Sequence, residues 1–158
     1  MLVAATDKGI CRLSFNEGHA ELVARFPQAE LIEGGAEFGE LLAKVMAAIE
    51  QRGNTSTIPL DVQGTAFQEA VWHELGQIPR GETRSYAQIA AAVGRPGAVR
   101  AAGSANGVNP VAVLVPCHRV IRGDGNLGGY AYGQAIKEKL LAREAKPALD
   151  HSDQPLAR

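Results

Sequence analysis

One cysteine of this sequence stands in a setting that could make it a nucleophile. Cys117 follows the apolar run Val111 to Val115 and precedes His118 and Arg119. A thiol reacts as its thiolate, and nearby basic groups favour that form. Adjacent residues do not face one another on a helix or strand, so His118 is expected to act on the sulfur through a bridging water. For the Cys-His pair alone, a buried structural cysteine beside a surface histidine is the alternative.

The other cysteine and the histidines show no comparable pattern. Cys11 lies in a hydrophobic stretch and is predicted to be a core thiol. The sequence has 2 cysteines without a Cys-x-x-Cys pair, and its 4 histidines lack zinc-ligand spacing. We therefore expect no disulfide framework, no bound metal and no cofactor.

Two short helices joined by a tight turn are predicted just before the reactive segment. Ser85 and Gln88 form a capping box that opens the first helix, and Gly94 ends it. The segment RPGAVRAAGSANG starts a second helix, which ends at Gly107. This pattern is typical of a helix-turn-helix, and a plain helical hairpin is the alternative.

The second of these helices combines small side chains with one long cation. Ala98, Ala101, Ala102 and Ala105 are expected to share a face that another body can approach closely. Tight packing within the core is the other explanation of that face. It leaves Arg100, in the middle of the helix, without a role.

Periodicity predicts the remaining elements. Alternating apolar and polar residues indicate a hairpin in residues 2–15, and helical spacing from residue 36 indicates a helix that Gly53 stops. Thr65 and Gln68 open a further helix through a second capping box. A glycine-rich loop then leads to a last helix, residues 134–145. In that helix we expect Ile136, Leu140 and Leu141 to face inward and Lys137, Lys139 and Arg143 to face outward.

Composition and charge indicate a globular protein with an uneven charge distribution. The 158 residues are 46% hydrophobic and 21% charged. Residues 1–79 carry 5 basic and 11 acidic groups, a net −6, whereas residues 80–124 carry 6 arginines and 2 acids, a net +4. The arginines permit nucleic-acid binding, although a solvated basic face would look the same.

No segment of the sequence is predicted to span a membrane or to act as a signal peptide. The longest aliphatic run, Val111 to Val115, is far too short to span a bilayer, and Asp7 and Lys8 interrupt any signal-peptide core. We expect a soluble, cytoplasmic protein. Residues 147–158 contain two prolines and are expected to form a disordered tail.

The string VLVPCHRVIRGDG, preceded by Asn-Pro and the alanine-rich helix and followed by Gly-Gly-Tyr, resembles the O6-alkylguanine-DNA alkyltransferase family. The resemblance covers Gly64 to Ala145, and the N-terminal part resembles the companion domain of bacterial members more loosely. It implies an α+β protein in which a small N-terminal αβ domain with an antiparallel sheet, ribonuclease-H-like, is followed by a mostly helical, winged helix-turn-helix-like domain. The expected domains are 1–61 and 62–146, with a boundary near 59–64.

The resemblance also implies catalytic roles. Cys117 is the expected alkyl acceptor, and His118 is the water-linked base. Glu144, on the last helix, is the carboxylate that orients the imidazole. Asn109 is the expected hinge that braces the active-site turn, and Tyr86 crowds the target phosphate and hydrogen-bonds the base.

Further residues are implied to contact DNA. Arg100 is expected to fill the gap left by a flipped base, and Tyr130 to form the wall on which guanine stacks. The Ala131 amide is expected to donate to the lesion oxygen, and the small side chain of Ala131 leaves the size of the pocket open. Arg119 is expected to be structural or to face a phosphate.

The expected function is therefore DNA repair by a single-use methyltransferase. A monomer would bind duplex DNA through the minor groove, flip the damaged guanine and move the alkyl group from its O6 to Cys117. Activity on the O4 of thymine is left open. The alternatives are a non-catalytic module that binds alkyl lesions and a cysteine hydrolase that uses Cys117 and His118.

Overall fold

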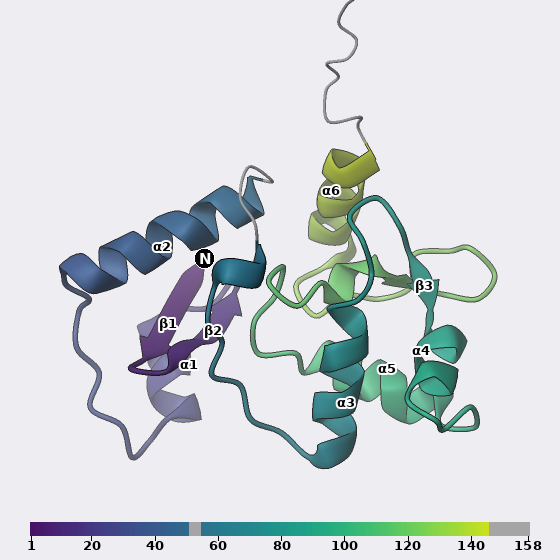
Figure 1. Cartoon of the computed structure of the whole chain (residues 1–158), viewed down its shortest axis with the longest axis horizontal. Helices are drawn as coiled ribbons and strands as arrows, with labels where there is room; N and C mark the ends of the chain where they lie inside the picture. Colours follow the sequence, from purple (N-terminus) through teal and green to yellow (C-terminus); the bar gives the residue numbers. More distant parts are fainter. Residues whose placement is uncertain (51–54, 146–158) are drawn as a thin grey trace, which may run out of the picture.

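The computed structural model describes residues 1–50 and 55–145, which form two adjoining units (Figure 1). The N-terminal unit contains strands β1 (Leu2–Thr6) and β2 (Gly9–Ser14) and helices α1 (His19–Arg25) and α2 (Ala36–Ile49). The second unit contains helices α3 (Ala66–Leu75), α4 (Tyr86–Ala92), α5 (Val99–Gly107) and α6 (Gln134–Ala145) and strands β3 (Arg84–Ser85) and β4 (Val120–Ile121). Two 3-10 turns, η1 (Thr55–Thr57) and η2 (Cys117–Arg119), complete the list. The predicted α+β class is confirmed.

The N-terminal unit is built on the predicted hairpin. β1 and β2 pair antiparallel, with an irregularity between Ala4 and Ala5. Ile10 and Leu13 of β2 are completely buried, and α2 contributes Val45 to the same core. The hairpin therefore places β2 against the rest of the molecule.

Two predictions concern residues that the structure does not describe. The helix α2 ends at Ile49, with Glu50 as its C-cap, and the predicted stop at Gly53 lies outside the described residues. The tail expected at 147–158 also lies outside them.

The second unit follows its capping signals closely. The side chain of Thr65 accepts from Gln68 N at the start of α3, and that of Ser85 accepts from Gln88 N at the start of α4, each at 3.1 Å. Gly94 has φ of +80°, which allows the chain to leave α4 and turn sharply toward α5. α4 and α5 pack together, as a helix-turn-helix requires.

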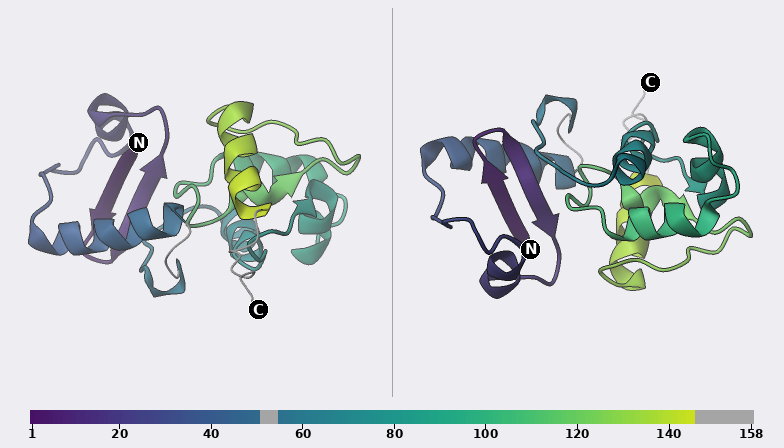
Figure 2. Two further views of the ribbon diagram at one scale, coloured as in Figure 1. Left: turned by 90° about the horizontal axis from the view of Figure 1, so that it is seen from above. Right: turned by 90° about the horizontal axis from the view of Figure 1, so that it is seen from below.

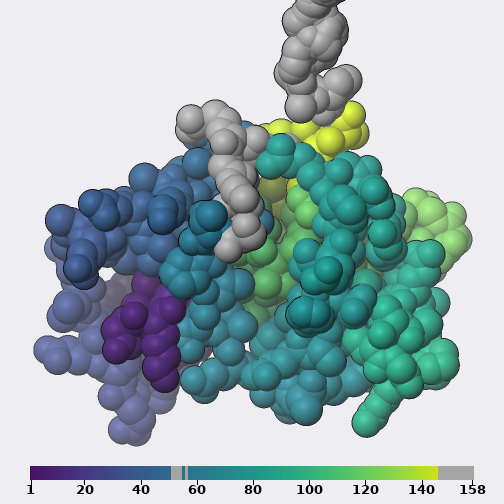
Figure 3. Space-filling model, viewed as in Figure 1, coloured from purple at the N-terminus to yellow at the C-terminus, as the bar shows by residue number. Residues whose placement is uncertain are grey.

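β2 joins the two units through backbone hydrogen bonds. Leu13 N donates to Pro110 O at 2.9 Å, and Ala112 N donates to Leu13 O at 3.0 Å. Nearby, Arg12 is buried and pairs with Glu17 at 2.6 Å. Figures 2 and 3 show the purple and blue residues of the N-terminal unit lying directly beside the teal and green residues of the second.

One hydrophobic core extends through both units. It includes Ile10 and Val45 from the N-terminal unit as well as Val71 and Val120 from the second. The predicted boundary near 59–64 lies on the extended connection before α3 and remains a prediction. None of the helices within the described residues is both long and apolar enough to cross a membrane.

Candidate active site

Asn109 fixes the chain between α5 and the reactive cysteine. Its side-chain amide donates to Val115 O at 2.7 Å, and its side-chain oxygen accepts from Val111 N at 3.0 Å. Asn109 is buried, so these bonds form away from water and hold the two ends of the apolar run together. The geometry agrees with the bracing role expected of this residue.

Two very tight turns bring the chain to the sulfur. Val113 has φ of +70°, and a 2.8 Å bond between its two neighbours closes a γ-turn around it. A β-branched residue rarely adopts this conformation, because its side chain crowds the backbone. Pro116 has φ of −82° and ψ of 67°, the values of an inverse γ-turn, and Cys117 N completes it with a 2.8 Å bond.

The Cys117 thiol is buried, with 4% of the residue exposed, at the start of η2. It donates to the hydroxyl of Tyr130 at 3.9 Å. Burial raises the pKa of the Cys117 thiol, while hydrogen bonds from Asn109 and Tyr130 and the charge of Lys137 oppose that rise. The resting sulfur is therefore a thiol with partners ready to stabilise its thiolate.

The residue after it joins a buried ion-pair network behind the pocket. His118 is completely buried, and its Nε2 lies 2.8 Å from Glu144 Oε2. Although burial raises the pKa of Glu144, bonds from His118 and Arg119 and their charges lower it to about 2. Because Glu144 is thus a carboxylate, Nε2 donates to it. Nδ1, which has no hydrogen-bond partner among the described residues, is left as the acceptor.

Arg119 completes this network from the other side. Its guanidinium donates twice to Glu144, at 2.9 and 2.7 Å, and once to Ile78 O at 2.7 Å. Three bonds to partly or fully buried groups favour the structural role expected of Arg119 over the phosphate-facing one. Arg119 ties η2 to α6 and to the segment that follows α3.

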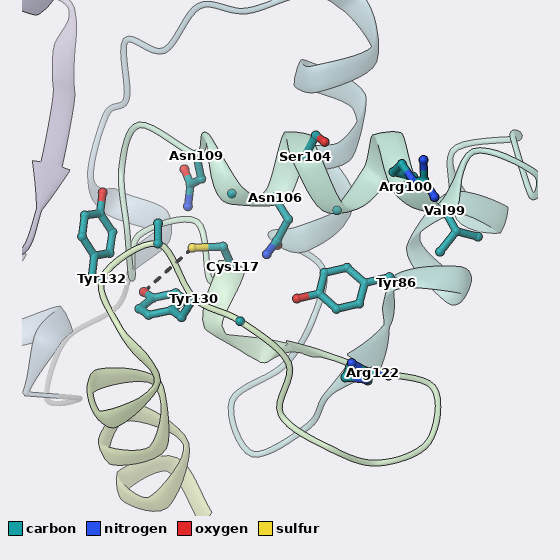
Figure 4. Close-up of a pocket in the computed structure, with 14 residues that line it drawn as sticks. Tyr86, Val99, Arg100, Ser104, Asn106, Asn109, Cys117, Arg122, Tyr130 and Tyr132 are labelled. Carbon is teal, nitrogen blue, oxygen red and sulfur yellow. Dashed lines mark hydrogen bonds between the residues drawn. The ribbon is translucent and has the colours of Figure 1, made fainter.

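A cavity of about 870 Å³ opens beside the sulfur (Figure 4). Six of the residues predicted for the site line it: Tyr86, Arg100, Asn109, Cys117, Tyr130 and Ala131. The other three, His118, Glu144 and Arg119, do not line it and form the buried network described above. The structure therefore brings the nine predicted residues into one neighbourhood, in two layers.

The helix α5 presents a face different from the one expected. Ala102 and Ala105 are buried in the core, with 1% and 2% exposed, whereas Ala101 is exposed. The alternative of core packing is therefore correct for two of the four alanines. The cavity is instead lined by Arg100, Gly103 and Ser104, together with further residues of this helix. Small side chains do leave the backbone accessible there, but on the neighbouring face.

Lys137 contradicts its predicted outward position. It is completely buried, and its Nζ donates to Val120 O, Leu127 O and Gly129 O at 2.7, 2.6 and 3.1 Å. The three carbonyls replace the water that an ammonium loses on burial, which no helical periodicity could reveal. Lys137 thus fastens the glycine-rich loop to α6.

Sequence reasoning missed several residues that line the cavity, Tyr132 above all. Tyr132 is half-buried, and its ring packs edge-on against Tyr130 with centroids 5.6 Å apart. A large aromatic residue in a glycine-rich loop was the available signal. Asn106 and Arg122 also line the cavity, and nothing in their sequence setting distinguished them.

The expected core thiol, Cys11, is only half-buried, and burial raises its pKa. Within the part of the chain that the structure describes, no group of three or more histidine, cysteine, aspartate or glutamate residues could hold a metal ion.

Two family models match the chain in succession. Residues 1–62 match the ribonuclease-like domain of 6-O-methylguanine DNA methyltransferase, and residues 66–146 match its DNA binding domain. A crystal structure of Mycobacterium tuberculosis OGT in complex with DNA superposes with a TM-score of 0.75 at 38% identity, covering 90% of this chain and 84% of that one.

Curated relatives agree. A methylated-DNA–protein-cysteine methyltransferase of Methanosarcina barkeri is 42% identical over 91% of this chain and 89% of its own length. The bifunctional transcriptional activator/DNA repair enzyme Ada of Escherichia coli is 45% identical over 92% of this chain, which spans only 42% of Ada. With both domains matched in order, and a relative matched over nearly its whole length, the chain belongs to the 6-O-methylguanine DNA methyltransferase family.

Proposed function

We propose that this protein repairs DNA by moving an alkyl group from the O6 of guanine to the sulfur of Cys117, once per molecule. The observation that carries the proposal is a buried thiol at the wall of a cavity of about 870 Å³, with a His118–Glu144 pair behind it. Family membership supports the same reaction. Activity on the O4 of thymine stays an open extension of it.

The reaction begins with the removal of a proton from the thiol. His118 Nδ1, left as the acceptor by the bond from Nε2 to Glu144, takes this proton through a bridging water. As the thiolate forms, the Tyr130 hydroxyl can reverse its bond and donate to the sulfur. The thiolate then attacks the alkyl carbon, the new S–C bond forms, and the C–O6 bond breaks with its electron pair moving to guanine.

Guanine leaves more readily if it gains a proton. Burial and the charge of Cys117 raise the pKa of the Tyr86 hydroxyl, although Arg122 opposes the shift, so Tyr86 is protonated at neutral pH. It can donate to the base and recover a proton from His118 through solvent. The net result is transfer of the thiol proton to guanine and of the alkyl group to sulfur. Nothing in this sequence regenerates the thiol.

DNA binding is assigned to the helix-turn-helix. Arg100 is exposed on α5 and lies at the end of the cavity where Tyr86 also lies (Figure 4). An arginine there can occupy the space left in the duplex when a base is flipped out, while Gly103 and Ser104 allow the helix close to a narrow groove. We propose minor-groove binding on this basis, and we also propose that the protein binds as a monomer. A cytoplasmic site of action is part of the same proposal.

Intact mass after incubation with a duplex that contains one O6-methylguanine tests the proposal. We expect the mass of one methyl group to be added per chain, with none added in Cys117→Ser. Cys11→Ser is the matched control and should still be methylated. Lesion binding without any gain in mass would replace this proposal with the non-catalytic binding module. Repeated turnover of an activated ester would favour the hydrolase.

A further inference from the structure

One buried polar side chain at the wall of the cavity has an atom without a partner. Asn106, in the last turn of α5, is 6% exposed and lines the cavity. Its side-chain Oδ1 is buried and forms no hydrogen bond with any described residue. A buried amide oxygen of this kind lowers stability, because it has lost its bonds to water without replacement. The side chain of Asn106 therefore needs an explanation other than the stability of the fold.

The position of Asn106 along α5 places it between two reactive side chains of the cavity. One turn before it, a Cβ atom at Gly103 would lie 3.7 Å from Cδ1 of the Tyr86 ring. One turn after it, Asn109 N donates to Asn106 O at 3.4 Å, and the Asn109 side chain hydrogen-bonds Cys117. Residues three positions apart in a helical turn are neighbours on one face. Asn106 therefore lies between Tyr86 and Cys117, as it does in Figure 4.

The amide of Asn106 is oriented as a donor to a molecule in the cavity. Figure 4 shows its nitrogen pointing into the pocket, with no hydrogen bond to the other residues drawn. Nδ2 carries two hydrogens and can only donate. The group that it would bind is therefore an acceptor that a substrate brings into the space between Tyr86 and Cys117.

An O6-alkylated guanine offers an acceptor that intact guanine lacks. In intact guanine, N1 carries a hydrogen and is a donor. An alkyl group on O6 removes that hydrogen, so N1 of the lesion has a free lone pair and accepts. N1 is bonded to the carbon that carries O6, and it therefore lies close to the alkyl group that must face the Cys117 sulfur. Proteins that flip a base out of DNA read it through hydrogen bonds to this Watson–Crick edge.

We propose that Asn106 recognises the alkylated base, with Nδ2 donating to N1 of the flipped guanine. The proposal rests on the proposed function and adds to it a means of distinguishing damaged from intact guanine. With intact guanine, the N1 hydrogen would face the Nδ2 hydrogens, and neither donor would have an acceptor. The donor that Asn106 presents to the cavity thus gains its partner when the lesion enters.

The test compares single-turnover rates of methyl transfer to the full-length protein from two duplexes. One contains O6-methylguanine, and the other contains its 1-deaza analogue, in which a C–H group replaces N1. In the wild type, the rate for O6-methylguanine should exceed that for the analogue. In Asn106→Leu, which has no donor, this ratio of rates should be smaller by about tenfold or more. Comparison between variants cancels the difference in intrinsic reactivity of the two bases.

Val99→Ala is the matched control, because Val99 also belongs to α5 and lines the same cavity, near Arg100 in Figure 4. It should keep the wild-type ratio even if it changes both rates. Asn106→Ala, whose side chain is too small to obstruct the base, should show the same reduced ratio as Asn106→Leu. A wild-type ratio in both Asn106 variants would overturn the proposal.

Urea unfolding supplies a second readout, which does not depend on transfer. Asn106→Leu removes an unpartnered buried oxygen, so its midpoint should equal or exceed that of the wild type. A clearly lower midpoint would show that the amide is bonded within the resting protein, and would also overturn the proposal. Absence of methyl transfer by the wild-type protein would instead contradict the proposed function.

Discussion

At the scale of single residues, the site holds its nucleophile in the protonated state until a base can act. The Cys117 thiol is buried, and burial favours the thiol over the thiolate by raising its pKa. Reactivity therefore depends on removal of the proton during the reaction. A preformed thiolate is not required.

This arrangement predicts how the rate depends on pH. Because burial raises the pKa of Cys117 above its ordinary value of 9.0, a His118→Asn variant, which lacks the base, should transfer methyl at a single-turnover rate that is still increasing at pH 9. Rapid-quench measurements on O6-methylguanine duplex between pH 6 and pH 10 would show the slope. In that variant, a plateau that begins below about pH 8 would indicate a thiolate formed in advance and would contradict this account.

At the scale of elements, α6 determines where both layers of the site lie. Glu144 holds η2 through His118 and Arg119, and Lys137, two turns earlier, holds the loop that carries Tyr130. The predicted bounds of α6 were correct, because apolar spacing is a local signal. The direction of Lys137 was not predictable, since it depends on carbonyls 8 to 17 residues away.

Replacement of Lys137 tests whether its hydrogen bonds hold the glycine-rich loop against α6. Lys137→Met leaves three buried or partly buried carbonyls without their donor, so we expect the free energy of unfolding to fall by about 3 kcal/mol. Urea unfolding measures the change. Lys139→Met removes the same charge from an exposed position of α6 and should change the stability little. Equal effects of the two variants on the free energy of unfolding would show that the hydrogen bonds of Lys137 do not stabilise the fold.

Glu144 makes the free energy of unfolding depend on pH in the acidic range. Its pKa is about 2 in the folded protein and 4.5 ordinarily, so its contribution to stability is fully present above about pH 4.5 and is lost as the pH falls toward 2. Glu144→Gln should therefore lower the free energy of unfolding by roughly 2 kcal/mol at pH 7. The difference from wild type should shrink at pH 3. A difference that is the same at both pH values would exclude Glu144 as its source.

At the scale of the whole molecule, the two units share one hydrophobic core and are joined by backbone hydrogen bonds. The hairpin, the capped helices and the reactive segment could each be predicted from residues close in sequence. The bonds from Leu13 to Pro110 and Ala112, and the packing of Phe15 on Tyr132, could not, because they join residues about 100 positions apart. The sequence therefore revealed the cysteine and its partners, whereas the support of the cavity wall required the structure.

The shared core predicts a single unfolding transition. Trp72, the single tryptophan of the sequence, is buried in the second unit and donates to Ala105 O at 2.9 Å. Its fluorescence therefore reports the unfolding of that unit. Far-ultraviolet circular dichroism reports both units. The two signals should give the same midpoint in urea. Separate midpoints would show that the N-terminal unit unfolds independently.

The γ-turn at Val113 has a consequence for how the protein can be altered. A conformation of this kind costs roughly 1–3 kcal/mol, and the surrounding bonds from Asn109 and from Leu13 keep it in place. Glycine at position 113 would relax the backbone, since glycine adopts this conformation at no steric cost, but it would also lose the burial of the Val113 side chain. The same relaxation would loosen the segment that aims the sulfur. Relief of backbone strain and a fixed position of the sulfur are therefore in opposition at this one residue.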